Sequence, residues 1–274
     1  MRPGLVAFPK PPEEYIAFAV QHGASHLEID LFGPDQWLER FHSARVRELR
    51  RLVQQAGLTC SFHTPYVLNL ADYLPYIRAR AVEYVTHLLR IAGEADALWV
   101  TVHPGYGIGI PTLDWVRSKA LDSLRRSLDF LLPFAEKLKV PLALENVSPS
   151  PPGSEIIFLL DSPEEMAQVL NKASSPYLKV CLDVGHAVVS GDLREFLRVC
   201  KDRLVGAHIH DNDGKDDLHL VPGQGVINWQ QVLSEFLNAG FNGVLNIEVY
   251  DDTDKAKGLC FLKRLIGEIT GSIS

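Results

Sequence analysis

The sequence predicts an α/β protein folded as a single closed (β/α)₈ TIM barrel. Strand-like and helix-like patterns alternate along the whole chain of 274 residues, which indicates a parallel sheet with helices on its faces. Eight such units fit one barrel better than the alternative, an open doubly wound sheet. Six strand-like runs end in a residue able to bind a metal, which predicts that these ends share one mouth. We therefore expect residues 1–274 to form one domain, with its site at the C-terminal ends of the strands.

The first half of the chain contains four strand–helix units. The expected strands comprise residues 4–8 and 26–32 and two apolar runs that end at His63 and His103. The expected helices comprise residues 12–22, 38–57, 74–95 and 112–138. Apolar residues recur with helical spacing in these segments, and Gly57 is a typical residue to end a helix.

The second half repeats the pattern four more times. Its strands are predicted to end at Glu145, Asp183 and His208 and to finish with residues 244–249. The expected helices begin near Ser162 and near Asn228 or span residues 193–199 and 254–269. Ser162 is a favourable N-cap because Pro163 follows it at the first helical position. No Gly-rich phosphate-binding turn follows the first strand, so a dinucleotide-binding fold is disfavoured.

Composition and charge are those of an ordinary soluble globular protein. The net charge of −7 provides no basic field that would attract nucleic acid. The N-terminus lacks the apolar core of a signal peptide, and no apolar run is long enough to span a membrane. The four cysteines lack metal-site spacing, and we expect them to be reduced in a cytoplasmic protein.

Four strand-end residues form a set suited to one divalent cation: Glu145, Asp183, His208 and Glu248. Carboxylates and a neutral imidazole are ligands for Mn²⁺, Mg²⁺, Co²⁺ or Zn²⁺. Without a cation, three carboxylates at one mouth would repel each other strongly. The alternative is a set of separate ion pairs, but the flanks of these strand ends contain almost no Lys or Arg. The set therefore predicts a metal centre.

Five further residues near this set are predicted to bind either substrate or additional metals: His63, His103, His186, Asp217 and His219. The alternative for His63 and His103 is an ordinary hydrogen-bonded histidine at a strand end. Asp217 and His219 stand at positions i and i+2, on the same side of an extended loop. The alternative for this loop is a charged, solvated segment.

Other residues near the predicted mouth have two interpretations. Glu28 and Asp30 either point into the mouth or support it from behind. Tyr66, Tyr106 and Trp115 either line a substrate pocket or pack within the loops.

Two glycine-containing segments are expected to shape the loops of the mouth. Pro104 and Gly105 follow His103, so the backbone there can approach a ligand closely. Residues 223–225, Gly-Gln-Gly, allow a tight turn into the next helix.

At these residues the sequence resembles the xylose-isomerase-like (β/α)₈ superfamily, which joins sugar and sugar-phosphate isomerases and epimerases with endonuclease IV. The matching blocks follow the family's order and comprise residues 63–70, 103–105, 144–146, 182–186, 208–211, 217–219 with 223–225, and 247–248. As a set, they are specific for the superfamily and cover most of the chain.

In the isomerase and epimerase branch, the resemblance implies one divalent metal held by residues matching Glu145, Asp183, His208 and Glu248. Such a metal grips a carbonyl and its neighbouring hydroxyl and stabilises an enediolate. The two glutamates then act as acid and base, because one removes a proton and the other returns it. A residue matching His186 contacts the sugar.

In the endonuclease IV branch, the resemblance implies three zinc ions that serve cleavage of abasic DNA. All nine matching positions are filled: His63, His103, Glu145, Asp183, His186, His208, Asp217, His219 and Glu248. The chain departs from the nuclease pattern at residues 183–186, which read Asp-Val-Gly-His rather than Asp-Thr-Cys-His. It departs again at residues 208–211, which read His-Ile-His-Asp rather than His-Leu-Asn-Asp.

The sequence is therefore interpreted as a metal-dependent sugar or sugar-phosphate isomerase or epimerase of carbohydrate metabolism, with Glu145 and Glu248 catalytic. The expected cofactor is one Mn²⁺, Mg²⁺ or Co²⁺. The alternative is a trinuclear zinc phosphodiesterase, and a third is a barrel that binds metal or sugar without turnover. The expected partner is a small sugar or hydroxy-carbonyl substrate. A nucleic acid belongs only to the zinc alternative, no membrane partner is expected, and assembly with further copies of the chain is left open.

Overall fold

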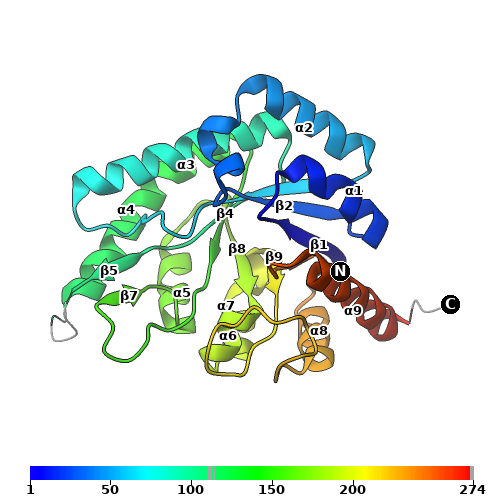
Figure 1. The fold of residues 1–274 in the computed structure, drawn as a ribbon. Coiled ribbons are helices and arrows are strands. Elements are labelled where there is room, and N and C mark those ends of the chain that lie inside the picture. The colour runs from blue at the N-terminus through cyan, green and yellow to red at the C-terminus, as the bar shows by residue number, and fades with distance from the viewer. Residues whose placement is uncertain (110–112, 114, 272–274) are drawn as a thin grey trace.

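Eight parallel strands close into a barrel in the order β1-β10-β9-β8-β6-β4-β3-β2 (Figure 1). This computed structural model describes residues 1–109, 113 and 115–271. The strand β1 closes the barrel because it pairs in parallel with both β2 and β10. The predicted closed barrel is thereby confirmed. The barrel strands are β1 (Arg2–Ala7), β2 (His26–Asp30), β3 (Thr59–His63), β4 (Val100–Val102), β6 (Leu142–Glu145), β8 (Leu178–Asp183), β9 (Leu204–Ile209) and β10 (Val244–Ile247).

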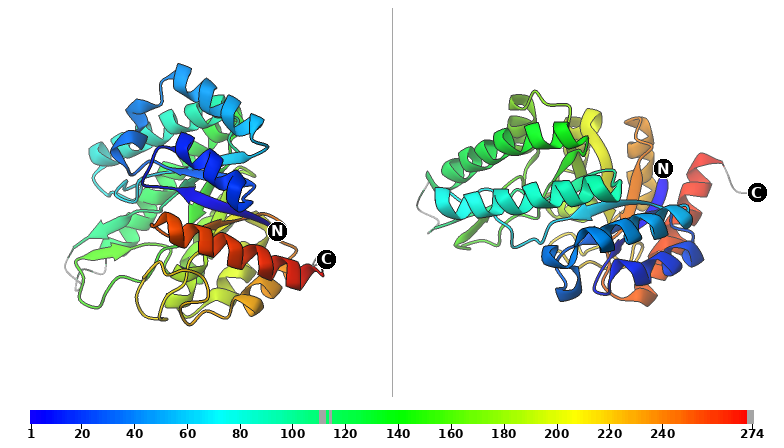
Figure 2. Two further views of the ribbon diagram at one scale, coloured as in Figure 1. Left: turned by 45° about the vertical axis from the view of Figure 1, so that its right-hand side comes forward. Right: turned by 90° about the horizontal axis from the view of Figure 1, so that it is seen from above.

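Helices connect successive strands and surround the barrel, as Figures 1 and 2 show. Seen from above in Figure 2, α3 runs beside α4, and it contacts both α2 and α4. The helices are α1 (Pro12–His22), α2 (Ser43–Gln55), α3 (Pro75–Ala95), α4 (Trp115–Leu138), α5 (Pro163–Lys172), α6 (Val184–Val189), α7 (Leu193–Cys200), α8 (Trp229–Asn238) and α9 (Asp252–Thr270), with short 3₁₀ turns at Pro34–Gln36, Leu38–Arg40 and Lys201–Arg203.

A second, two-stranded sheet stands outside the barrel. Its antiparallel strands are β5 (Tyr106–Ile108) and β7 (Ile156–Phe158), which extend the loops that follow β4 and β6. It lies on the side of the barrel opposite to the N-terminus and to the end of α9 (Figure 1). The sequence analysis missed this sheet, since each strand has three residues and its partner is about fifty residues away.

One predicted helix start changes in the structure, and another lies outside the described residues. The helix expected over residues 38–57 begins only at Ser43, because the His42 ring accepts a hydrogen bond from a backbone N–H of the first turn and caps the helix there. A 3₁₀ turn precedes it instead. The expected start of the fourth helix, Thr112, lies outside the described residues, and α4 is described from Trp115.

Side chains fill the interior of the barrel near the N-terminal ends of its strands. Trp99, Ala143, Cys181 and Val244 form a buried apolar cluster there. The ring of His26 stacks on Trp99 with centroids 4.8 Å apart, and burial lowers the pKa of His26 to about 3. The imidazole is therefore neutral. Because side chains close this end of the barrel, the interior is reached from the mouth, at the C-terminal ends of the strands.

All four cysteines are free, as the sequence predicts: Cys60, Cys181 and Cys200 are buried, and Cys260 is exposed. Among the described helices, none combines the length and the apolarity that a membrane crossing requires.

Lys255 of α9 is a fully buried cation that bridges the segments following the first and the last barrel strands, β1 and β10. Its Nζ donates to the carbonyls of Phe8, at 2.7 Å, and Tyr250, at 2.8 Å. Replacement by methionine keeps the apolar stem but leaves both carbonyls without this donor. We expect Lys255→Met to lower the free energy of unfolding by about 2 kcal/mol.

Urea unfolding measures this change, and Lys257→Met is the matched control. Lys257 lies two residues away, is exposed and pairs with Asp254 on the helix surface, so its substitution is expected to cost no more than about 0.5 kcal/mol. Equal unfolding midpoints for the two variants would contradict the role of Lys255.

Candidate metal centre at the barrel mouth

Seven of the nine metal-binding candidates line a cavity of about 840 Å³, whereas Asp183 and His208 are fully buried and contact these lining residues. Ends of β1, β2 and β10 contribute one aromatic wall, which includes Phe8, Phe32 and Tyr250. The loop after β6 and the β5–β7 sheet form the opposite wall with Pro149, Pro151, Pro152, Tyr106 and Phe158. A cavity of this volume is within the range of small-molecule sites.

The central group, defined as Glu145, Asp183, His208 and Glu248, gathers at the barrel mouth with ligand atoms within 4.8 Å of one another. The Nδ1 atom of His208 lies 2.8 Å from Glu145, 3.2 Å from Glu248 and 3.8 Å from Asp183. Asp183 and His208 are fully buried, and Glu145 is 1% exposed. The four residues predicted to hold one metal are therefore brought together.

The donor set of the central group fits a divalent cation. One ring nitrogen can carry only one proton, yet oxygens of three carboxylates surround His208 Nδ1. Glu145 takes the hydrogen bond at 2.8 Å, and the buried Oε2 of Glu248 has no hydrogen-bond partner among the described residues. A bound cation would satisfy all four residues at once.

A second group, called the His63 group, comprises His63, His103 and Glu145. The Nε2 atoms of His63 and His103 lie 2.9 Å and 3.2 Å from Glu145 Oε2. Because Glu145 uses Oε1 toward His208 and Oε2 toward these two rings, it belongs to both groups.

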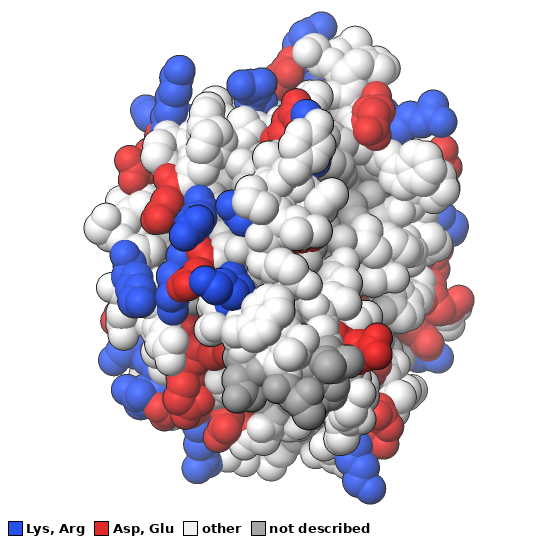
Figure 3. Space-filling view, turned by 90° about the vertical axis from the view of Figure 1, so that its left-hand side faces the viewer, with Lys and Arg blue, Asp and Glu red and all other residues white. Residues whose placement is uncertain are grey.

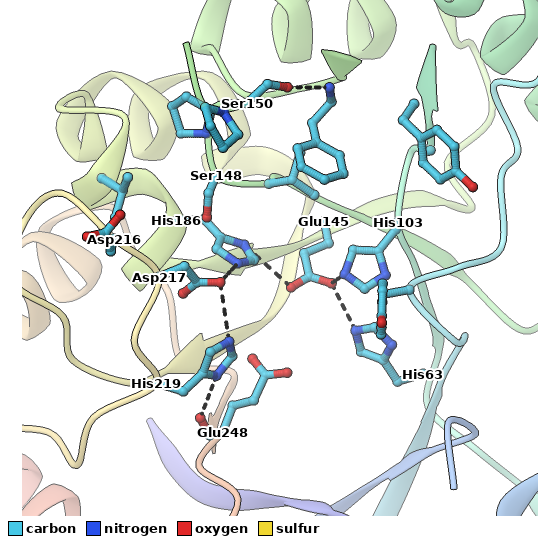
Figure 4. A pocket seen from close by; sticks show the side chains of 18 of the residues that line it. His63, His103, Glu145, Ser148, Ser150, His186, Asp216, Asp217, His219 and Glu248 are labelled. Atoms are coloured by element: carbon cyan, nitrogen blue, oxygen red, sulfur yellow. Dashed lines mark hydrogen bonds and ion pairs between the residues drawn. The ribbon is translucent and has the colours of Figure 1, made fainter. Parts of the chain in front are cut away.

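A third group, called the His186 group, comprises His186, His210, Asp217 and His219. Asp217 Oδ2 lies 3.0 Å from His186 Nε2 and 3.3 Å from His219 Nε2. Figure 4 shows His186, Asp217 and His219 on one side of Glu145 and His63 and His103 on the other, with Glu248 facing Glu145 across the space between them. The nine candidate residues thus form one connected cluster at the barrel mouth, because Glu145 belongs to two groups and His186 lies 3.5 Å from Asp183.

Backbone carbonyls orient three of these imidazoles. The Nδ1 atoms of His63, His186 and His219 contact the carbonyls of Thr64 (2.7 Å), Asn146 (2.9 Å) and Glu248 (3.0 Å) respectively. A carbonyl only accepts, so Nδ1 carries the proton in each ring and Nε2 points toward the carboxylates. Metal-binding histidines are oriented by such contacts in general.

The helix α6 is a feature that the sequence analysis missed. The Asp183 side chain caps it by accepting a hydrogen bond from the His186 backbone N–H at 2.6 Å. Asn146 exchanges two hydrogen bonds with the Asp183 backbone. These contacts place His186 one helical turn after a central carboxylate, where a loop was expected.

Asp217 and His219 do converge, but for a different reason than predicted. His219 has φ +47°, in the left-handed region, so the segment is not a simple extended loop. The conformation costs about 1 kcal/mol or more for a residue that is not glycine. It turns the His219 ring back toward Asp217 and the barrel mouth.

Asp211 organises the loop in which these two residues stand. Its carboxylate accepts from the backbone N–H groups of Gly223 and Ile227 and from the indole of Trp229. A side chain at Gly225 would collide with Asp211 and the neighbouring backbone. The expectation that residues 223–225 allow a tight turn is thus supported by the contacts.

The structure decides between the alternatives that the sequence left open for the aromatic residues of the mouth, and it shows what surrounds Gly105. Gly105 lines the cavity. A side chain at this position would come within 2.2 Å of Asn69 Oδ1, so the glycine leaves the space that Asn69 occupies. Tyr66 and Tyr106 line the cavity, whereas Trp115 lies outside it and packs against Tyr73.

His210 and Glu28 are two polar residues whose contacts the sequence analysis did not assign. His210 is fully buried, and its Nε2 lies 3.0 Å from Asp183 Oδ2. Glu28 is fully buried beneath His208, whereas Asp30 lines the cavity. His210 lies two residues after His208, and Glu28 lies two residues before Asp30. Because alternate residues of a strand share a face, this spacing could have predicted that both side chains lie near the site.

Electrostatics at the barrel mouth are dominated by burial and by carboxylate–imidazole contacts. Burial opposes charge on Asp183, but His186 and His210 outweigh it and hold the pKa of Asp183 at about 2. Burial alone would lower the pKa of His63, yet Glu145 raises it to about 10. By contrast, burial prevails at His103 and lowers its pKa to about 4.

The sequence and the fold are both similar to those of known proteins. The profile of the family described as xylose isomerase-like TIM barrel matches residues 16–265. A solved structure, described as a D-tagatose 3-epimerase-like protein, aligns over 100% of both chains with TM-score 0.87 and 26% identity.

Two curated relatives are enzymes of different classes. Fructoselysine 3-epimerase of Escherichia coli O157:H7 is 22% identical over 247 residues, which cover 87% of this chain and 86% of the relative. A probable endonuclease 4 of Acholeplasma laidlawii is 23% identical over 248 residues, which cover 84% and 81%. The relatives thus include both branches that the sequence resembles.

Metal affinity is expected to rise with pH across the neutral range. Burial lowers the pKa of His208, but Cys181, Glu248 and Glu145 raise it well above the usual value. At pH 7 the metal-free ring therefore holds a proton on Nδ1 that a cation must displace. One displaced proton corresponds to about tenfold in affinity per pH unit.

Calorimetric titration with Mn²⁺ at several pH values, in buffers of different ionisation enthalpy, measures both the affinity and the protons released. An affinity that stays constant or falls between about pH 6 and about pH 8 would contradict the linkage.

Proposed function

This chain belongs to the xylose isomerase-like TIM barrel family, and within it we propose that the protein is a divalent-metal-dependent sugar isomerase or epimerase. One observation carries the proposal. Glu145 and Glu248, from β6 and β10, approach the same His208 nitrogen at the floor of a small-molecule cavity. Two strands separate β6 from β10 in the barrel, so the two carboxylates reach a substrate from different sides.

The residues of the central group have defined roles in this proposal. Asp183, His208 and the two glutamates would hold the cation, which, when bound, supplies a Lewis acid for a carbonyl and its adjacent hydroxyl. One glutamate removes the proton from the carbon beside the carbonyl, and the other returns a proton to the resulting enediolate. Return to the opposite face inverts the centre, whereas return to the neighbouring carbon isomerises the sugar.

The cavity favours a small, largely uncharged substrate. Lys215 is the one Lys or Arg among its described lining residues, so the walls offer no cluster of cations for a phosphate. On the face that carries β5 and β7, Lys and Arg side chains gather toward one side and the rim (Figure 3). Uncharged side chains occupy the middle of that face. A duplex would require cations along its track.

The two epimerase relatives support the same proposal. Fructoselysine 3-epimerase and the D-tagatose 3-epimerase-like protein each align with most of this chain. Both names refer to stereochemical change at a sugar carbon. We therefore infer a ketose or a related hydroxy-carbonyl compound as the substrate class.

The second candidate is a trinuclear zinc phosphodiesterase. The specific observation in its favour is the assembly of the His63 and His186 groups on either side of the central group. Three cations there would use all nine residues. In the isomerase proposal, the same two groups instead surround the substrate and orient Glu145.

Metal stoichiometry separates the two candidates. We expect elemental analysis to find about one Mn²⁺, Mg²⁺ or Co²⁺ per chain, since one central group has four protein ligands. A content near three zinc ions, together with cleavage of an abasic-site duplex, would instead support the phosphodiesterase.

Replacement of Glu248 by glutamine tests the proton transfer. We expect Glu248→Gln to slow exchange of the ketose proton with D₂O by at least about 100-fold, because the amide neither accepts nor returns the proton. NMR at saturating Mn²⁺, over a panel of ketoses, measures the exchange. Saturation compensates for weaker metal binding.

Glu235→Gln is the matched control. It removes a carboxylate from α8 on the outside of the barrel, where Glu235 pairs with Arg194. Exchange at the wild-type rate in Glu248→Gln, with the control also unchanged, would refute the assignment of Glu248.

A further inference from the structure

Glu28 of β2 is a buried carboxylate inside the barrel, directly beneath the central group. Its side chain is fully buried and does not line the cavity. Three donors surround it: Thr101 Oγ1 at 2.5 Å, Asn246 Nδ2 at 2.6 Å and His208 Nε2 at 2.9 Å. A carboxylate that accepts from three donors is satisfied in its ionised form.

The neighbouring barrel residues are arranged around this carboxylate. A side chain at Gly4 would come within 2.2 Å of Asn246 Oδ1, so glycine leaves the space that the asparagine occupies. Thr101 accepts from the Trp99 indole at 2.9 Å, which directs its own hydroxyl proton toward Glu28. These contacts hold the Glu28 carboxylate within hydrogen-bond distance of His208 Nε2.

His208 is oriented differently from the other imidazoles of the site. His63, His186 and His219 direct Nδ1 to backbone carbonyls and Nε2 to the carboxylates. In His208 the order is reversed, since Nε2 faces Glu28 and Nδ1 faces Glu145. Its second partner is a charged side chain rather than a neutral carbonyl.

We propose that Glu28 is a positioning residue that holds His208 as the Nε2–H tautomer once a cation displaces the Nδ1 proton, so that the Nδ1 lone pair faces the cation. This inference rests on the metal dependence included in the proposed function. Glu28 only accepts, so the single proton of a neutral His208 must lie on Nε2. The negative charge also makes Nδ1 a stronger donor to a metal.

Titration with Mn²⁺ tests the proposal without any sugar. We expect Glu28→Gln to weaken Mn²⁺ binding about 10- to 100-fold, because the amide keeps the shape of the side chain but lacks its charge. Thr101→Val removes one donor to Glu28 and keeps the charge, so we expect a smaller loss. Competition with a chelating dye measures both.

Glu165→Gln is the control for loss of a buried carboxylate. Glu165 lies on α5, is 8% exposed, and accepts from the Leu160 backbone N–H at 2.9 Å. It lies outside the three groups of metal-binding residues, so we expect unchanged Mn²⁺ affinity even if its thermal stability falls. An affinity of Glu28→Gln equal to that of wild type would overturn the proposal.

Two spectra of the wild-type protein provide an independent test. With Zn²⁺ bound, ¹⁵N NMR should place the His208 proton on Nε2, and a proton on Nδ1 would overturn the proposal. Glu28, Cys181 and His208 also lie within 4.8 Å of one another. With Co²⁺ bound, a sulfur-to-cobalt charge-transfer band would make Glu28 part of a direct metal site and would refute the positioning role.

The outcomes separate this proposal from the proposed function. Weaker Mn²⁺ binding by Glu28→Gln, with no exchange in any ketose, would support the positioning role and refute the isomerase. Ketose exchange with unchanged Mn²⁺ affinity in the variant would do the reverse. Absence of any divalent metal binding by the wild-type protein would refute both.

Discussion

Three carboxylates meet at one nitrogen of one imidazole, and one proton cannot satisfy them all. Glu145 receives the hydrogen bond from His208, while Glu248 Oε2, 3.2 Å from the same nitrogen, has no hydrogen bond within the described part of the chain. Such an arrangement is costly in a low-dielectric interior unless a cation joins it. The hydrogen bonds around the mouth hold these charged side chains in place.

The support has two layers. Backbone carbonyls orient the rings of His63, His186 and His219 from the outside, and Glu28 faces His208 from inside the barrel. The loop that carries Asp217 and His219 is itself held by Asp211. Charged or coordinating side chains therefore meet at fixed positions, and little reorganisation is needed when a ligand binds.

Glu145 links the two possible chemistries of the site. One oxygen belongs to the central group, and the other faces His63 and His103. In a sugar isomerase these rings would hold the base in place. In a phosphodiesterase they would share a second cation with it. The cavity walls, with Lys215 as the one Lys or Arg among the described lining residues, favour the smaller substrate.

The sequence alone predicted the barrel and six metal-binding candidates at its strand ends, because parallel strands of one closed sheet must all end on the same side. The alternation of strand and helix patterns and the spacing of the strand ends can both be read from short segments of the sequence. Tertiary structure decided the rest. The β5–β7 sheet depends on pairing between distant three-residue segments, and α6 depends on the Asp183 cap. Glu28 and His210 acquire their roles only when strands far apart in the chain bring His208 and Asp183 within hydrogen-bond distance of them.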